Sequence, residues 1–144
     1  MPREIISMSP DEIRAFVKGE KRLILATLAE DGAPWSDAAV FLLEGDRVFF
    51  RIPRSSRSYR NIRRDNRVCC IIERGPPPYY EIMGVMAHGQ AQEVRDGGQA
   101  LQIAARLAAQ RDPVASDAGD GAVFSIPLLE DVVSFDFSKI QRRH

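Results

Sequence analysis

The 144-residue sequence has only two cysteines and no net charge. Cys69 and Cys70 are adjacent in an apolar run, where neighbouring strand residues point to opposite faces, so we expect reduced core thiols and no disulfide framework. No apolar stretch reaches the roughly 18–20 residues of a membrane span, and the first residues lack the apolar core of a signal peptide. These absences predict a soluble, cytoplasmic protein that does not bind membranes.

Catalytic signatures are also scarce. The two histidines are His88 and His144, and the sequence has no serine elbow, no HExxH, no CxxC and no Walker motif. Hydrolase and metalloenzyme functions are therefore disfavoured, and we assign no metal ligand and no catalytic residue. The balance of 20 basic and 20 acidic residues excludes a generally basic nucleic-acid-binding protein.

The length favours a single domain over residues 1–144. Ser9-Pro10-Asp11-Glu12 predicts a capped helix that ends at Gly19. Strands are expected at 22–29, 34–43 and 47–52. Asp31-Gly32 and Glu44-Gly45-Asp46 separate these strands and suit hairpin turns, so the segment predicts an antiparallel meander.

The rest of the chain adds further strands and two helices. Helices are expected at 58–65 and 96–110, and extended segments at 67–73, 79–94, 122–128 and 131–137. Gly84 and Gly89 suit bulges or bends, and the last six residues are expected to be a solvated, mobile tail. Six or seven strands that do not alternate with helices predict a mainly β (α+β) fold, a small antiparallel barrel with peripheral helices.

The strongest local signal is a run of seven arginines against one aspartate over residues 51–67. Ser56 and Arg57 lie in the turn before a predicted helix, where free backbone N–H groups, a hydroxyl and a guanidinium suit a phosphate. The later arginines are expected to form a solvated face with favourable charges at the helix C-terminus: Arg60, Arg63, Arg64 and Arg67.

Several segments, taken in order, carry a family resemblance. After the first helix come TLAEDGAP (27–34), SRSYRNIRRDNRV (56–68) and GVMAHGQA (84–91). Together they resemble the split-barrel flavoproteins similar to pyridoxamine 5′-phosphate oxidase, over about residues 10–94. The resemblance implies a split barrel and a homodimer with FMN, or in some branches a deazaflavin coenzyme, in a groove between the subunits. It also implies a flavin-dependent oxidoreductase that acts on a small molecule.

The resemblance carries over particular positions. It assigns the cofactor's phosphate to the end of the third strand and the following turn, at Arg51, Ile52, Ser56, Arg57 and Ser58. It places along the flavin ring a stretch of the second strand, at Ser36, Asp37, Ala38 and Ala39. Ser58 stands where the family has lysine, which removes one cation and leaves the choice between FMN and deazaflavin open. An aspartate would oppose a reduced anionic flavin, so Asp37 is expected to point away from the ring.

Other interpretations remain open. Trp35, Tyr79 and Tyr80 are candidate walls of the flavin site, or packing residues of the core or an interface. Pyridoxamine phosphate oxidation itself is not expected, because the chain lacks a second basic cluster other than Arg142 and Arg143. A non-catalytic flavin or haem carrier with His88 as axial ligand is an alternative. Nucleic-acid binding through the arginine-rich helix is a further alternative, which the zero net charge of the chain disfavours.

Overall fold

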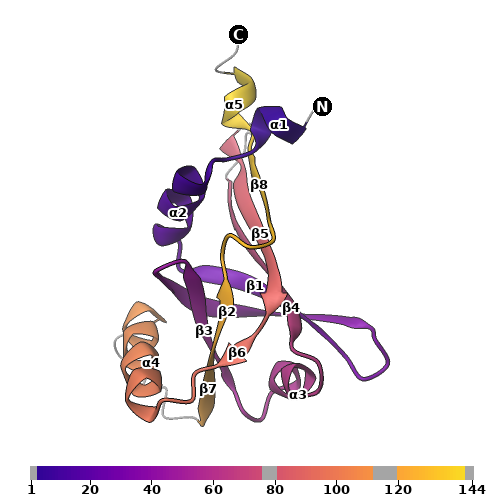
Figure 1. Cartoon of the computed structure of the whole chain (residues 1–144), viewed down its shortest axis with the longest axis vertical. Coiled ribbons are helices and arrows are strands. Elements are labelled where there is room, and N and C mark those ends of the chain that lie inside the picture. The colour runs from indigo at the N-terminus through magenta and orange to yellow at the C-terminus, as the bar shows by residue number, and fades with distance from the viewer. Residues whose placement is uncertain (1–2, 76–80, 112–119, 142–144) are drawn as a thin grey trace.

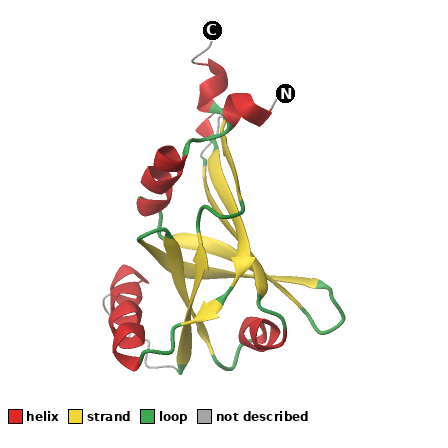
Figure 2. Ribbon diagram, viewed as in Figure 1, coloured by secondary structure: helices red, strands yellow, loops and turns green. Residues whose placement is uncertain are grey.

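The computed structural model describes residues 3–75, 81–111 and 120–141, which form five helices and eight strands (Figures 1 and 2). The helices are α1 (Arg3–Ile6), α2 (Pro10–Lys18), α3 (Arg57–Arg64), α4 (Gly97–Arg111) and α5 (Ser138–Gln141). The strands are β1 (Arg22–Leu28), β2 (Pro34–Glu44), β3 (Arg47–Pro53), β4 (Arg67–Arg74), β5 (Met83–Gln90), β6 (Gln92–Glu93), β7 (Gly121–Pro127) and β8 (Val132–Asp136).

All strand pairs are antiparallel and form one sheet in the order β6-β7-β3-β2-β1-β4-β5-β8. The predicted meander is confirmed in β1, β2 and β3. Its turns place Gly32 at φ +86° and Gly45 at φ +59°, a region that other residues rarely adopt. The mainly β, antiparallel prediction is therefore correct.

The sheet curls into a half-barrel around one core. β5 and β7 are not hydrogen-bonded neighbours, yet they touch, and a Cβ on Gly89 would lie 3.2 Å from Pro127 Cδ. The concave face buries Leu25, Phe41 and Phe50, which alternate with outward-facing residues. A second cluster fills the opposite face of β2, β3 and β7, where Leu42, Phe49 and Val123 pack against Ile103 and Leu107 of α4.

The helix α2 forms as its sequence predicts. Ser9 Oγ accepts a hydrogen bond from Glu12 N at 3.2 Å, and Glu12 Oε1 accepts one from Ser9 N at 3.0 Å. This reciprocal capping box satisfies two backbone donors that a helix start leaves free. The buried face of α2 is the predicted one: Ile13, Phe16 and Val17.

Two details correct the sequence-based expectations. The described residues hold eight strands rather than six or seven, because the extended segment 79–94 contains both β5 and the two-residue β6. The β4–β5 register continues through Gly84 and Gly89 without a bulge. Gly84 instead leaves room for the Phe135 ring, which a Cβ would strike. Tyr79 and Tyr80 lie outside the described residues.

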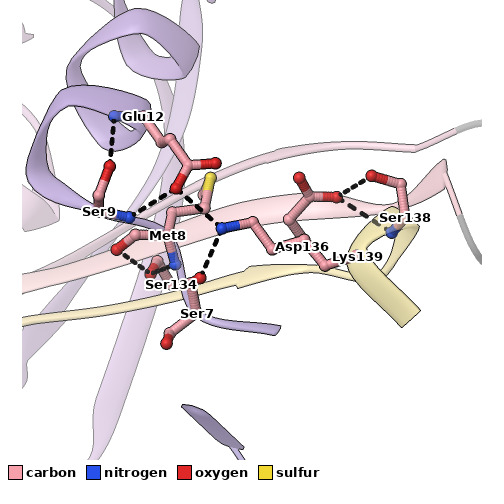
Figure 3. Close-up of polar contacts among 8 residues, drawn as sticks. All are labelled: Ser7, Met8, Ser9, Glu12, Ser134, Asp136, Ser138 and Lys139. Carbon is pink, nitrogen blue, oxygen red and sulfur yellow. Dashed lines mark hydrogen bonds and ion pairs between the residues drawn. The ribbon is translucent and has the colours of Figure 1, made fainter. Parts of the chain in front are cut away.

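The expected mobile tail instead begins with the ordered helix α5, which contacts α1 beside the N-terminus (Figure 1). Lys139 Nζ donates hydrogen bonds to Ser7 O at 2.9 Å and to Glu12 Oε1 at 2.8 Å (Figure 3). Met8 N donates to Ser134 Oγ at 2.8 Å. These contacts join the two ends of the chain, which sequence periodicity could not reveal because the partners lie more than 120 residues apart.

Candidate functional site

The site is organised by the start of α3. Ser56 is the N-cap: its Oγ accepts from Tyr59 N at 3.1 Å and donates to Pro53 O at 2.7 Å. Asn61, which is 3% exposed, donates from Nδ2 to Thr27 Oγ1 at 3.0 Å and so fixes α3 against β1. Two of the motif segments, 27–34 and 56–68, are therefore joined by a buried hydrogen bond.

A groove of about 930 Å³ lies between β2, β3 and the start of α3, within the range of about 300–1,000 Å³ usual for small-molecule sites. Seven of the nine residues assigned by the resemblance line it: Asp37, Ala38, Ala39, Arg51, Ile52, Ser56 and Ser58. They come from three elements, and only the folded sheet brings them together. The groove also contains Lys21, Arg22 and Gln110, which the sequence did not single out.

Arg51 is placed by the strand next to it. Its guanidinium lies over the backbone of Gly121 at the start of β7, where a Cβ would come within 2.6 Å of Arg51 Nε. Glycine at that position leaves the space that the guanidinium occupies. Gln110, from the end of α4, contributes a buried Oε1 that has no hydrogen-bond partner in the described structure. The groove therefore combines cationic donors with an unsatisfied buried acceptor.

Asp37 is held by donors from the protein itself. Its Oδ2 accepts hydrogen bonds from Trp35 Nε1 at 2.9 Å and from the hydroxyl of Ser58. Ser58 is 1% exposed and Asp37 is half-buried, so this pair forms part of the wall of the groove. The position where the family has lysine thus holds a serine whose proton is committed to a carboxylate. A phosphate would not be bound at this point of the groove, because Asp37 would repel it.

Two assigned residues lie outside the groove. Arg57 lies over the Trp35 ring at 4.5 Å and lines a neighbouring hollow of about 650 Å³. Ser36 is exposed and pairs with Ala26 on the other face of β2. Ala38 lies on the same face of β2 as Ser36 and still lines the groove, so strand alternation alone does not explain this position of Ser36. The direction of Arg57 depends on the packing of α3 against the β1–β2 hairpin and has no sequence signal.

His88, the alternative haem ligand, does not line the groove. It is half-buried on β5, opposite Cys69, and its Nδ1 is buried without a hydrogen-bond partner in the described parts of the chain. A ligating histidine usually donates its second ring N–H to an acceptor. Cys69 and Cys70 are free, as expected, and burial raises the pKa of both thiols. Neither thiol is therefore an activated nucleophile.

Comparison with known proteins defines the class to which this fold and groove belong. The family model described as pyridoxamine 5′-phosphate oxidase matches residues 9–128. The chain belongs to this family, whose fold is the flavoprotein split barrel, as the sequence resemblance predicted. No curated protein matches the sequence.

Solved structures share the fold at low identity. A conserved hypothetical protein, Rv2991 from Mycobacterium tuberculosis, superposes with a TM-score of 0.84 at 23% identity, over 98% of this chain and 92% of its own. A FAD-binding protein from Mesorhizobium loti superposes with a TM-score of 0.68 at 18% identity, over 89% of this chain and 94% of its own. The heme storage protein HutZ from Vibrio cholerae superposes with a TM-score of 0.70 at 21% identity, over 87% of this chain and 94% of its own. The same backbone therefore carries proteins with different ligands, and only the side chains of a particular site can specify one.

Within the described residues, no helix is long and apolar enough to cross a membrane. The same residues contain no group of three or more His, Cys, Asp or Glu side chains that could hold a metal ion.

Proposed function

We propose that the groove binds FMN and that the protein is a flavin-linked oxidoreductase acting on a small molecule. The observation that carries the proposal is the gathering of seven predicted cofactor residues around one groove in a chain that belongs to this family. The buried acceptor on Gln110 and the Arg51 guanidinium that lies over Gly121 support the fit. A cytoplasmic location is part of the proposal.

The chain's own residues bind and orient the cofactor. Arg51 binds the phosphate with a guanidinium that can contact two oxygens, and Ile52 and Ala38 supply apolar contacts along the groove. Gln110 Oε1 accepts a hydrogen bond from a cofactor N–H or O–H donor. The bound flavin would supply the hydride or electron transfer, which explains why the sequence needs no catalytic triad.

A homodimer with the cofactor at its interface is part of the proposal. An apolar row crosses the outer face of five strands, each residue directly opposite the next: Ala38, Ile24, Ile71, Met86 and Val133. Ile24 is 44% exposed and Ile71 38% exposed, values that favour a covering partner. Ala38 belongs both to this row and to the groove, so a second copy on the row would also border the cofactor.

The proposal is tested by titrating the purified full chain with FMN, FAD and a deazaflavin coenzyme. FMN is expected to bind at micromolar concentration or tighter. The variant Arg51→Gln should weaken FMN binding about 10- to 100-fold, because a charge-assisted hydrogen bond contributes about 1.5–3 kcal/mol. Arg106→Gln is the matched control, since Arg106 is an α4 arginine paired with Glu44 on the surface.

If the protein binds deazaflavin in preference to FMN, the proposed cofactor is wrong but the assignment of the groove as its binding site stands. Failure to bind any flavin, or equal weakening by Arg51→Gln and Arg106→Gln, would contradict the assignment of the groove. A haem site at His88 predicts an intense Soret absorbance after haem addition, and the absence of an acceptor for Nδ1 makes this outcome less favoured.

A further inference from the structure

The arginine run, residues 51–67, divides into two sets in the folded chain. Four arginines are engaged elsewhere: Arg51 in the groove, Arg54 with Asp120 at 3.0 Å, Arg63 over the Tyr59 ring at 6.0 Å, and Arg67 with Asp65 at 2.6 Å. The other three line a single hollow: Arg57, Arg60 and Arg64. None of these three forms an ion pair with a described carboxylate.

The hollow lies between α3 and the β1–β2 hairpin, which extends away from the body of the sheet (Figure 1). Positions 57, 60 and 64 follow the spacing i, i+3, i+7, so the three side chains leave α3 on one side. The volume of about 650 Å³ is enough for a small molecule.

Each guanidinium is held while keeping free donors. Arg57 lies on the Trp35 ring at 4.5 Å. Arg60 Nη1 donates to Ser55 O at 3.0 Å. Arg64 Nη2 donates to Leu28 O at 2.7 Å and to Asn61 Oδ1 at 3.1 Å. Neutral acceptors and an aromatic face orient these side chains without neutralising their charge.

The gathering of three arginines on one side of α3 has an electrostatic cost. Like charges at i, i+3 and i+4 spacings destabilise a helix by a few tenths of a kcal/mol for each pair, about 0.2–0.5. Glu30 and Asp31 line the hairpin side, and Asp31 Oδ1 already accepts from Ala33 N at 3.0 Å. The lining therefore holds three positive and two negative side chains, which suits a compact anion and disfavours a long polyanion.

We propose that this hollow is a separate binding site for the carboxylate or phosphate group of a small molecule, held by Arg57, Arg60 and Arg64. Guanidinium groups match both oxyanions because each can donate two parallel hydrogen bonds. The site is distinct from the flavin groove, since the two are lined by different residues on either side of the start of α3. The inference does not depend on which flavin the groove binds.

Trp35 provides the measurement, because it is the only tryptophan of the chain and lines the hollow. Its fluorescence is followed while the full chain is titrated with inorganic phosphate, with citrate, and with chloride at matched ionic strength. Phosphate or citrate, but not chloride, should give a saturable change and raise the melting temperature. The oxyanion that binds more tightly identifies the preferred group.

The double variant Arg60→Gln/Arg64→Gln should weaken this binding at least about tenfold, because two charge-assisted contacts are lost. Arg63→Gln is the matched control, since Arg63 lies on the same helix and contacts Tyr59 instead. If the double variant does not fold, the single variants Arg60→Gln and Arg64→Gln are compared with the same control.

A linear response, or equal effects of the oxyanions and chloride, would overturn the site. So would binding that the arginine variants leave unchanged. Competition between phosphate and FMN, with both ligands weakened by Arg60→Gln/Arg64→Gln, would show a single cofactor site and overturn the separation. Failure of FMN to bind at all would reject the proposed function but leave the phosphate titration informative.

Discussion

Lys139 shows how much one side chain contributes to joining the ends of this chain. Its ammonium group contacts both the carboxylate of Glu12 and the carbonyl of Ser7 (Figure 3). The hydrogen bond from Lys139 to Glu12, together with those from Ser9, lowers the pKa of Glu12 from 4.5 to about 2. Because the folded pKa lies below the unfolded value, the stabilisation is complete above pH 4.5 and is lost as the pH falls toward 2.

The variant Lys139→Met is expected to lower the free energy of unfolding by about 1 kcal/mol at pH 7, the upper range for an ion pair that solvent still reaches. Urea unfolding of wild type and variant at several pH values measures the effect. The difference between them should shrink between pH 4.5 and 2 as Glu12 becomes protonated. Glu12→Gln should remove the same pH dependence, and a difference that stays constant with pH would contradict the role of this pair.

At the scale of elements, α3 determines the arrangement of both candidate sites. Its cap residue Ser56 lines the groove, and its arginine side lines the neighbouring hollow. Asn61 and Ile62, both buried, anchor the helix to the sheet. A small rotation of α3 would therefore alter both sites together.

The variant Ser56→Ala removes the cap of α3 and should destabilise the protein by about 1 kcal/mol, the usual loss for an N-cap serine. Ser55→Ala is the control, because Ser55 contributes only its backbone carbonyl to the hydrogen bonds described here. Thermal and urea unfolding of the two variants measure the difference. Equal stabilities would show that the cap at Ser56 does not stabilise α3.

At the scale of the whole molecule, one part of the outer face of the sheet is covered by a helix and another part is exposed. α4 covers the outer face of β2, β3 and β7, whereas β1 and β4 expose Ile24 and Ile71. Burial of apolar area stabilises association at roughly 25 cal/mol per Å² before its entropic costs are counted. The exposed row is therefore the surface at which we expect dimerisation.

The variant Ile71→Glu should convert the expected dimer to a monomer, because it places a charge in the centre of the apolar row. Sedimentation velocity at micromolar concentration measures the change. Leu101→Glu is the control: Leu101 is 75% exposed on α4, away from the row, and its variant should remain dimeric. A wild-type monomer, or dissociation by both variants alike, would contradict the proposed interface and the cofactor position beside it.

The sequence by itself determined most of the secondary structure and the fold class. The capping box at Ser9, the glycine turns at positions 32 and 45, and the period-2 strands are local signals, so they predict local structure. The order of motifs identified the family that the comparison confirms. The two-residue β6, the helix α5 and its contacts had no such signal, since their partners are distant in the chain.

Only the tertiary structure decided how the candidate residues are arranged. The arginine run looks uniform in the sequence, yet the pairing of β3 with β7 places Arg51 in the groove, and the packing of α3 places Arg57 over Trp35. Ser58 resembles a phosphate ligand until the fold places it against Asp37. Gln110 enters the groove because α4 packs across the sheet. The sequence determines which residue types are present. The orientation of the arginine side chains and the hydrogen-bond partner of the Ser58 hydroxyl depend on packing between segments that are distant in the chain.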